Sequence, residues 1–269
     1  MSVNEEKAPR TSVFEKIAPI LVVLSIGLAF MVGVLWQKVN NLEKGGTTAT
    51  TNTGGQPNQP VVSLDTIKGL FDKNLVKFGG KDRKVLFVEV ADPSCPYCHV
   101  ATGLNSTLNN QMGGQFKLVK DGGKYIAPVA EMRKLVDFGK ASYVWIYTPG
   151  HGNGEMGSKA LYCAQDVGKF WEVHDLLYTN AGYDFMNTTV KNDKTKSEEV
   201  ANFLKSATDP AEMKKCLDSG KYDSRLTEET DIAKSIGISG TPGFFINATS
   251  YAGAYSWTDM KSTVDAALK

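Results

Sequence analysis

The sequence has few cysteines and no excess of charge of either sign. Four cysteines occur in 269 residues, too few for a small fold built on disulfides. Lysine and arginine number 30 against 29 aspartates and glutamates, so no overall electric field attracts nucleic acid, and we expect no nucleic-acid partner. A chain of this length has room for one large core and smaller appendages. These counts exclude a disulfide-built miniature protein and a strongly basic binding protein.

The N-terminal part lacks charge over one long stretch, and no small-residue cleavage site follows it. Residues 17–36 contain no charged side chain, and a helix of that length spans about 30 Å, one hydrocarbon core. The run continues into QKVNNLEK, so we predict an uncleaved transmembrane signal anchor. Lysine and arginine are slightly more frequent in residues 1–16 than just after the span, which places this tail in the cytoplasm. The sequence therefore predicts a single-pass cell-membrane protein whose bulk is extracytoplasmic.

Residues 37–60 form the predicted linker to a domain that covers residues 61–269. Within the linker, the stretch from residue 45 to 60 is rich in Gly, Thr, Asn and Pro, a composition that cannot bury apolar surface and favours a flexible tether. Four apolar residues have a heptad-like spacing, which suggests a weak dimer through paired anchors: Val32, Leu35, Val39 and Leu42.

In residues 61–269, short apolar runs alternate with helical patterns, which is typical of an α/β domain. We predict strands at residues 84–92, 142–147 and 243–247, a short strand at 116–120, and a further strand within 249–257. We predict helices at residues 97–111, 128–138 and 257–269, and a helical section over about 158–236. Residues 152–157 read GNGEMG, but TPGH separates them from the strand before, so we predict a loop and no nucleotide cofactor.

Cys95 and Cys98 form a CxxC motif between a predicted strand and a predicted helix. The helix N-terminus offers unpaired N–H groups and the positive end of the helix dipole, which would lower the pKa of Cys95. Cys98 follows one turn later, where it could resolve a mixed disulfide. Pro96 suits the first helical turn, and no second CxxC is present to complete a zinc site. The pattern favours redox chemistry over a structural disulfide or a metal site.

Two further features could take part in thiol chemistry: a glutamate in the strand before the CxxC motif and a proline before a later strand. Glu89 sits in an otherwise apolar strand, where a buried carboxyl would carry protons between the thiols and water; an edge carboxylate facing solvent is the alternative. Thr241 and Pro242 directly precede a predicted strand. Pro242 either starts that strand or is a cis-proline that displays the backbone of Thr241 to a substrate.

In combination, Glu89, CPYC at residues 95–98 and Gly-Thr-Pro at 240–242 resemble the thioredoxin superfamily. The segments KALYCAQDVGKFWEVHDLLY and MKKCLDSGKY are similar to its DsbA-like branch, which carries a helical domain inserted into the thioredoxin fold. The resemblance covers roughly residues 61–269. It implies a cis bond at Pro242 near the two cysteines, Glu89 as the proton-transfer acid, and a second, non-catalytic disulfide between Cys163 and Cys216.

The chain departs from that branch in two places. Residues 113–141 form a longer connection than usual, in which we expect an extra hairpin or helix over the site. The CxxC dipeptide is Pro96–Tyr97, whereas the well-known DsbA oxidases have Pro-His. The resemblance therefore does not fix the reduction potential of the Cys95–Cys98 pair.

The resemblance implies an enzyme without a cofactor, a bacterial thiol–disulfide oxidoreductase that acts on exported proteins. We expect a dithiol oxidase that is recharged by a quinone-linked membrane partner. A reductase or isomerase is the alternative within the same chemistry. A non-enzymatic tethered binding module with a structural or zinc-bound CxxC is the alternative from another class.

Overall fold

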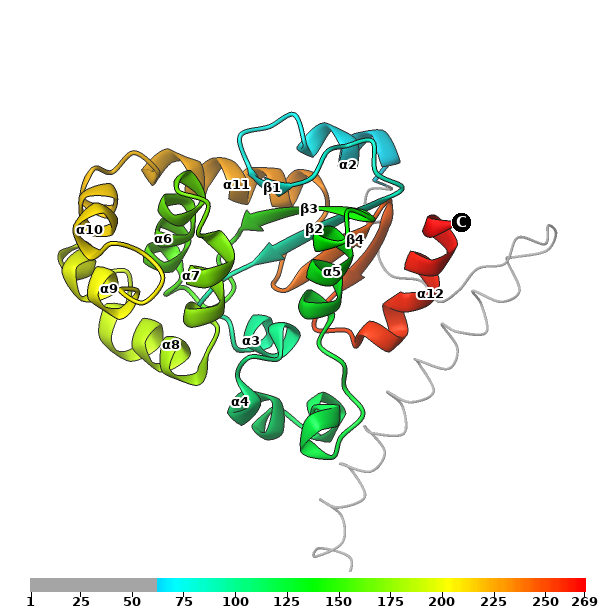
Figure 1. Ribbon diagram of the computed structural model, residues 1–269, viewed down its shortest axis with the longest axis horizontal. Coiled ribbons are helices and arrows are strands. Elements are labelled where there is room, and N and C mark those ends of the chain that lie inside the picture. The colour runs from blue at the N-terminus through cyan, green and yellow to red at the C-terminus, as the bar shows by residue number, and fades with distance from the viewer. Residues whose placement is uncertain (1–61) are drawn as a thin grey trace, which may run out of the picture. The chain divides into compact units, whose positions relative to one another are not determined.

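A five-stranded sheet lies at the centre of residues 62–269, the part of the chain that the computed structural model describes (Figure 1). Its strand order is β1-β3-β2-β4-β5. The strands are β1 (Val76–Phe78), β2 (Val85–Ala91), β3 (Ala141–Tyr147), β4 (Gly243–Ile246) and β5 (Thr249–Ala252). β2 runs parallel to β3 and antiparallel to β4, and the two edge strands pair antiparallel with their neighbours. The predicted α/β class and the three main strands are confirmed.

The predicted cytoplasmic tail (1–16), signal anchor (17–36) and linker (37–60) lie outside the described residues. Within residues 62–269, no helix combines the length and the apolar character that crossing a bilayer requires.

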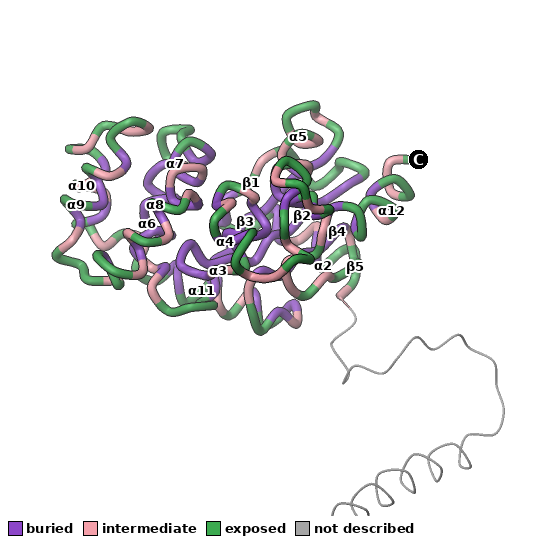
Figure 2. The backbone as a smooth tube through the Cα atoms, turned by 90° about the horizontal axis from the view of Figure 1, so that it is seen from below, coloured by how far each residue is buried: buried purple, intermediate pink, exposed green. Residues whose placement is uncertain are grey.

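The central strands are buried on both faces, and apart from Glu89 in β2 and Ser142 in β3 their side chains are largely apolar (Figure 2). Alternate residues of β2 point to opposite faces, and those on one face pack with α2 (Leu64–Leu70) and α11 (Asp223–Ser235). The other face is covered by α3 (Pro96–Thr102), α5 (Pro128–Asp137) and α12 (Trp257–Leu268). Glu89 belongs to this second face, on the side of the CxxC helix.

Between β3 and β4 the chain forms a helical insertion, on the left in Figure 1. Its helices are α6 (Glu155–Asp166), α7 (Phe170–Leu177), α8 (Asn180–Asp184), α9 (Ser197–Phe203), α10 (Pro210–Asp218) and α11, with a π-helix η3 (Phe185–Val190) and a 3₁₀ turn η4 (Lys194–Lys196). These bounds lie close to the helical section expected at about 158–236.

A buried ion pair ties the insertion to the sheet. Arg225 of α11 donates from Nε to Glu229 Oε1 at 2.7 Å, and both side chains are almost inaccessible. Glu229 Oε2 accepts from the backbone N–H of Tyr147 at 2.6 Å and from the hydroxyl of Tyr162 at 2.7 Å. One carboxylate therefore joins α11, β3 and α6.

The helix predicted over residues 97–111 is two helices, α3 and α4 (Ser106–Gln111). Gly103 ends α3 in the left-handed conformation, with φ of 70°. A Cβ atom on this glycine would lie 2.6 Å from Cβ of Ala127, so a close approach of the chain also requires glycine here. Asn105 then starts α4, since its side chain accepts from the backbone N–H of Leu108 at 3.0 Å.

The strand predicted at residues 116–120 is wrong. This segment forms two 3₁₀ turns, η1 (Gly114–Phe116) and η2 (Val119–Asp121), and its pairing with later residues is a single bridge between Leu118 and Tyr125. Gly113 and Gly122 both have positive φ and turn the chain before a strand can extend. The expected extra element in 113–141 is therefore a compact loop of short turns that leads into α5.

Candidate active site

The two cysteines of the CxxC motif lie at the start of α3. Cys95 is the N-cap residue and Pro96 occupies the first turn, so the Cys95 side chain sits at the N-terminal end of the helix. Both are free thiols. Cys95 keeps 3% of its surface exposed, whereas Cys98 is fully buried. Of the two, Cys95 is thus the one that another molecule can reach.

The two thiols have opposite pKa shifts. Hydrogen bonding from Cys98 lowers the pKa of Cys95 to about 7, and Thr241 and two backbone N–H groups act in the same direction against the effect of burial. Burial raises the pKa of Cys98 well above its usual value. At neutral pH a large share of Cys95 is therefore thiolate while Cys98 keeps its proton, which is the division of roles between an attacking and a resolving thiol.

Glu89 is fully buried in β2, which contradicts the alternative of an edge carboxylate facing solvent. Its Oε2 accepts a hydrogen bond from the hydroxyl of Tyr143. Burial raises the pKa of Glu89 to about 8. Its negative charge would raise the pKa of Cys98, so the two groups lie within electrostatic reach. A buried carboxyl with a pKa near 8 can donate a proton to a thiolate while it is neutral and can accept a proton from a thiol once it is ionised.

The Thr241–Pro242 peptide bond is cis, as the resemblance implied. Its loop faces the CxxC motif, because Cys95 Sγ lies 3.4 Å from the carbonyl oxygen of Thr241. Gly150, in the loop after β3, completes the contact: an added Cβ there would collide with the Thr241 side chain and lie 3.3 Å from Cys95 Cβ. Three segments that are distant in sequence thus meet at Cys95.

Asp92 holds two of these segments together, and the sequence did not single it out. Its buried carboxylate accepts from Ser94 N and Oγ, both at 2.7 Å, and from the N–H groups of Gly150 at 2.8 Å and His151 at 2.9 Å. Of the GNGEMG segment predicted as a loop, residues 152–154 belong to this loop, whereas residues 155–157 already form the first turn of α6. Gly154 leaves no room for a side chain beside Asp92. An aspartate directly after a buried strand was the available signal.

His99 is a second residue whose place the sequence did not indicate. It is fully buried, with Nε2 2.9 Å from the carbonyl oxygen of Pro93 and Nδ1 3.0 Å from that of Tyr178. Burial lowers the pKa of His99 to about 4. The imidazole therefore links α3 to the helical insertion.

An apolar hollow of about 400 Å³ lies beside the motif. Tyr97, the second residue of the CxxC dipeptide, is 42% exposed. Its ring lies edge-on to the ring of Phe116, with 5.8 Å between the two ring centroids. The lining consists mainly of aromatic and small residues from four segments: Tyr97, Phe116, Thr241, Ala252, Gly253, Ala254 and Tyr255. The loop within residues 113–141 thus contributes Phe116 to the surface around the site.

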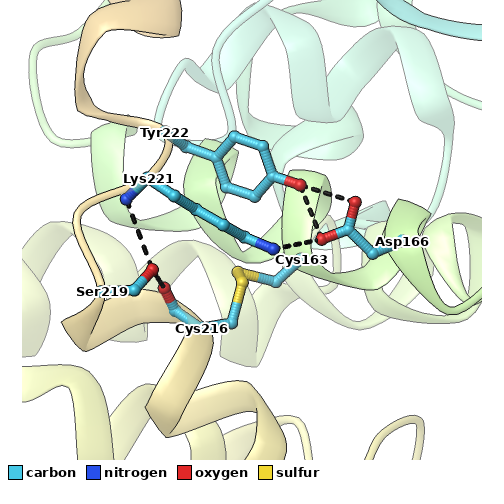
Figure 3. Close-up of a disulfide and its surroundings, with 6 residues drawn as sticks. All are labelled: Cys163, Asp166, Cys216, Ser219, Lys221 and Tyr222. Atoms are coloured by element: carbon cyan, nitrogen blue, oxygen red, sulfur yellow. Dashed lines mark hydrogen bonds and ion pairs between the residues drawn. A yellow bond between two sulfur atoms is a disulfide. The ribbon is translucent and has the colours of Figure 1, made fainter.

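A second sulfur pair lies within the helical insertion. A disulfide joins Cys163 of α6 to Cys216 of α10, the pairing that the resemblance implied (Figure 3). Next to it, Asp166 accepts hydrogen bonds from Lys221 and Tyr222, each at 2.6 Å (Figure 3). The bridge and this network fasten α10 and the start of α11 to α6.

The described residues do not fit a metal site at the CxxC motif. Across residues 62–269, no three His, Cys, Asp or Glu side chains converge as metal ligands would. A zinc-bound CxxC would therefore need ligands from elsewhere.

Two groups of curated proteins are similar to this chain. "Na(+)/H(+) antiporter NhaA 3" of Salinispora tropica is 26% identical over 194 residues, which is 71% of this chain. The chain spans only 24% of that protein's length. The "Putative protein-disulfide oxidoreductase" of Rickettsia bellii is 23% identical over 212 residues, covering 78% of this chain and 71% of its own length.

Solved structures show the same fold. Wolbachia pipientis α-DsbA1 has a TM-score of 0.52 at 18% identity, covering 72% of this chain and 91% of that protein. The reduced form of DsbG from Mycobacterium tuberculosis has a TM-score of 0.51 at 17% identity, covering 76% of this chain and 97% of that protein. The expected DsbA-like architecture of residues 62–269 is thereby confirmed.

The profile described as Thioredoxin matches residues 129–266, just over half of the chain. The match begins after α3, so it is independent of the CPYC motif from which the resemblance was first drawn. By that match, the chain belongs to the thioredoxin family.

Proposed function

We propose that this protein is a thiol–disulfide oxidoreductase of DsbA type, and that it acts as a dithiol oxidase. The observation that carries the proposal is the placement of Cys95, with its lowered pKa, between the N-terminus of α3 and the carbonyl oxygen of Thr241. A thiol whose pKa is near 7 is both a nucleophile and a good leaving group at neutral pH. Both properties are needed for repeated exchange.

In the oxidase direction the cycle starts from a disulfide between Cys95 and Cys98. A substrate thiolate attacks Cys95 Sγ, a mixed disulfide forms, and the electron pair of the broken bond leaves on Cys98. Glu89 in its protonated form supplies the proton that the Cys98 thiolate requires. The second substrate thiolate then attacks the mixed disulfide, so that Cys95 leaves as a thiolate and the substrate is oxidised.

The substrate surface that we propose is the hollow beside Tyr97. Its aromatic and small residues offer apolar contact without charge, which suits an unfolded segment of an exported protein. The backbone of Thr241 lies at one side of this surface, within reach of a substrate chain held over Cys95.

We further propose that residues 17–36 anchor the protein in the cell membrane, with the domain outside and a quinone-linked membrane protein as the oxidant. The uncharged stretch of 20 residues supports the anchor. Protease added to intact spheroplasts should digest the domain; a protected domain would contradict this orientation.

The test of the proposed function uses the full-length protein, oxidised and mixed with a peptide that carries two thiols. We expect stoichiometric peptide oxidation together with loss of the Cys95–Cys98 disulfide. The reduction potential of this pair, equilibrated against glutathione, decides the direction: about −120 to −180 mV supports the oxidase. A potential near or below about −250 mV would favour the alternative reductase. Absence of any exchange would contradict both.

A further inference from the structure

The backbone turn that leads into the CxxC motif has a partner for each of its three carbonyl oxygens. The first two, of Asp92 and Pro93, face groups within residues 92–99 themselves. The third, of Ser94, accepts a hydrogen bond from Nδ2 of Asn187 at 3.1 Å. Asn187 lies 93 residues further along the chain, in the helical insertion. A side chain from another part of the fold therefore completes the turn.

The peptide unit between Ser94 and Cys95 is bonded at both of its polar atoms. Its N–H donates to the carbonyl oxygen of Asp92 at 3.0 Å, and its C=O accepts from Asn187. Ser94 is fully buried, so without Asn187 its carbonyl oxygen would become a buried acceptor that has lost its partner. Asn187 thus holds this peptide unit in place.

Three hydrogen bonds fix the amide of Asn187. Besides its bond to Ser94, Nδ2 donates to the carbonyl oxygen of Tyr183 at 3.1 Å, and Oδ1 accepts from Nδ2 of Asn153 at 3.0 Å. The backbone N–H of Asn153 in turn donates to Oγ of Ser94 at 3.1 Å. Ser94, Asn153 and Asn187 therefore form a closed ring of hydrogen bonds. The ring requires an amide at position 187, because the side chain must both donate and accept.

Asn187 lies in the π-helix η3, whose wider turn is seen where the N–H of Lys191 donates to the carbonyl oxygen of Met186 at 3.0 Å. Single π turns occur frequently at functional sites. Lys191 and Asn192 then have φ of 45° and 61°, a left-handed conformation that residues other than glycine keep only where their surroundings hold them. Asn192 is held because its Oδ1 accepts from the N–H of Glu155 at 2.9 Å. The turn that carries Asn187 is thus fastened beside the start of α6.

The position of this peptide unit affects Cys95 because Cys95 is the N-cap of α3. The N–H groups of Tyr97 and Cys98 lower the pKa of Cys95 by hydrogen bonding to its sulfur, and such bonds weaken steeply when they are misaligned. Rotation about the Cα–C bond of Cys95 would carry Sγ and the preceding peptide unit together away from these groups. A contact that holds the peptide unit therefore also holds Sγ at the end of the helix.

We propose that Asn187 is a positioning residue for thiol–disulfide exchange, which acts through Ser94 to hold Cys95 Sγ against the N-terminus of α3. The inference rests on the proposed function, since it concerns the reactivity of the same thiol. Asn187 acts through the Ser94 carbonyl and not on the reacting atoms. The helical insertion thereby takes part in the reaction, because the place of its η3 turn affects how readily Cys95 forms a thiolate.

The test measures the pKa of Cys95 in the reduced full-length protein, from the rate of alkylation by iodoacetamide over a series of pH values. Cys95 is the thiol of the pair with exposed surface, and mass spectrometry of the peptide that contains it follows the product. Only the thiolate reacts, so the pH at which the rate is half its maximum equals the pKa. Wild type should have this midpoint near pH 7.

Asn187→Leu keeps the approximate size of the side chain but removes every hydrogen bond of the amide. We expect its midpoint to rise by about one pH unit, toward the value of about 8.5 for a free cysteine. Asn153→Ala removes the bond to Asn187 Oδ1 and should give a smaller rise. Asn180→Leu is the matched control and should keep the wild-type midpoint, since the Asn180 amide donates to Asp184 on the exposed surface of the insertion.

A rise in the Asn187 and Asn153 variants, with none in Asn180→Leu, supports the inference. If Asn187→Leu unfolds at lower urea concentration but keeps the wild-type pH midpoint, Asn187 has only a structural role and the inference is overturned. Should Asn187→Leu fail to fold, an unchanged midpoint in Asn153→Ala overturns it instead. A wild-type midpoint near about 8.5 would show that Cys95 is an ordinary thiol, and the proposed function would then fail as well.

Discussion

Replacing Cys95 with serine will reduce the oxidation of a dithiol peptide to the uncatalysed rate. The serine hydroxyl is not ionised at neutral pH and cannot form a disulfide, so neither the attack nor the mixed disulfide is available. Cys95 is also the only thiol of the pair with any exposed surface. The expected loss is complete. Peptide oxidation, followed by mass spectrometry of the peptide, measures it.

Cys98→Ser is the matched control, because it keeps the Cys95 thiol and replaces the neighbouring thiol with a hydroxyl of similar size. This variant should form a stable mixed disulfide with the peptide, since no second enzyme thiol remains to resolve it. Retained turnover in Cys95→Ser would contradict the mechanism. A trapped complex through Cys98 in that variant would instead reverse the roles of the two cysteines.

Replacing Glu89 with glutamine will stabilise the protein at neutral pH. It will also slow thiol–disulfide exchange, because glutamine cannot exchange a proton with Cys98. The pKa of Glu89 is raised from 4.5 to about 8 by burial. Below pH 4.5 both the folded and the unfolded state hold the proton. Between pH 4.5 and 8 the unfolded state loses it while the folded state keeps it, so the free energy of unfolding falls as pH rises. Above pH 8 both are ionised and the fall stops.

One pKa unit corresponds to about 1.4 kcal/mol, so wild type should lose about 3 kcal/mol between pH 4.5 and pH 7 relative to Glu89→Gln. The amide oxygen of glutamine still accepts the hydrogen bond from Tyr143, so packing is kept. Urea unfolding at a series of pH values measures the difference. Parallel stability curves for the two proteins across this range would show that Glu89 does not titrate as described.

Glu229→Gln is the informative contrast, because Glu229 is also buried in contact with the sheet but is paired with Arg225. Removing its charge leaves the Arg225 guanidinium buried without a counter-ion, which typically costs about 3–5 kcal/mol. The same chemical change thus stabilises at one buried carboxyl and destabilises at the other. The sign depends on whether a cation faces the carboxyl.

Much of the sheet could be predicted from the sequence because its central strands are continuous apolar runs of ordinary strand length. The residues at the site were recognisable for a different reason, since CPYC and Gly-Thr-Pro are local patterns whose chemistry depends on few neighbours. The error at residues 116–120 arose because FKLVK has the apolar content of a strand, whereas the glycines at 113 and 122 set the path of the chain.

Asp92 and His99 were harder to find from the sequence. Each acts through a contact with a segment tens of residues away, such as Asp92 with the loop after β3 or His99 with the end of α7. A buried histidine on a helix has the same appearance in sequence as an exposed one.

The disulfide between Cys163 and Cys216 turns part of the insertion into a covalent ring, with a sequence separation of 53 residues. α7, α8 and α9 all lie within that ring. A cut anywhere on the ring leaves the two pieces in one molecule, and a ring that opens by local unfolding has fewer conformations to explore before it closes again. The Cys95–Cys98 disulfide can therefore break and re-form in each cycle. The Cys163–Cys216 disulfide takes no part in that cycle and keeps the helices of the insertion covalently joined.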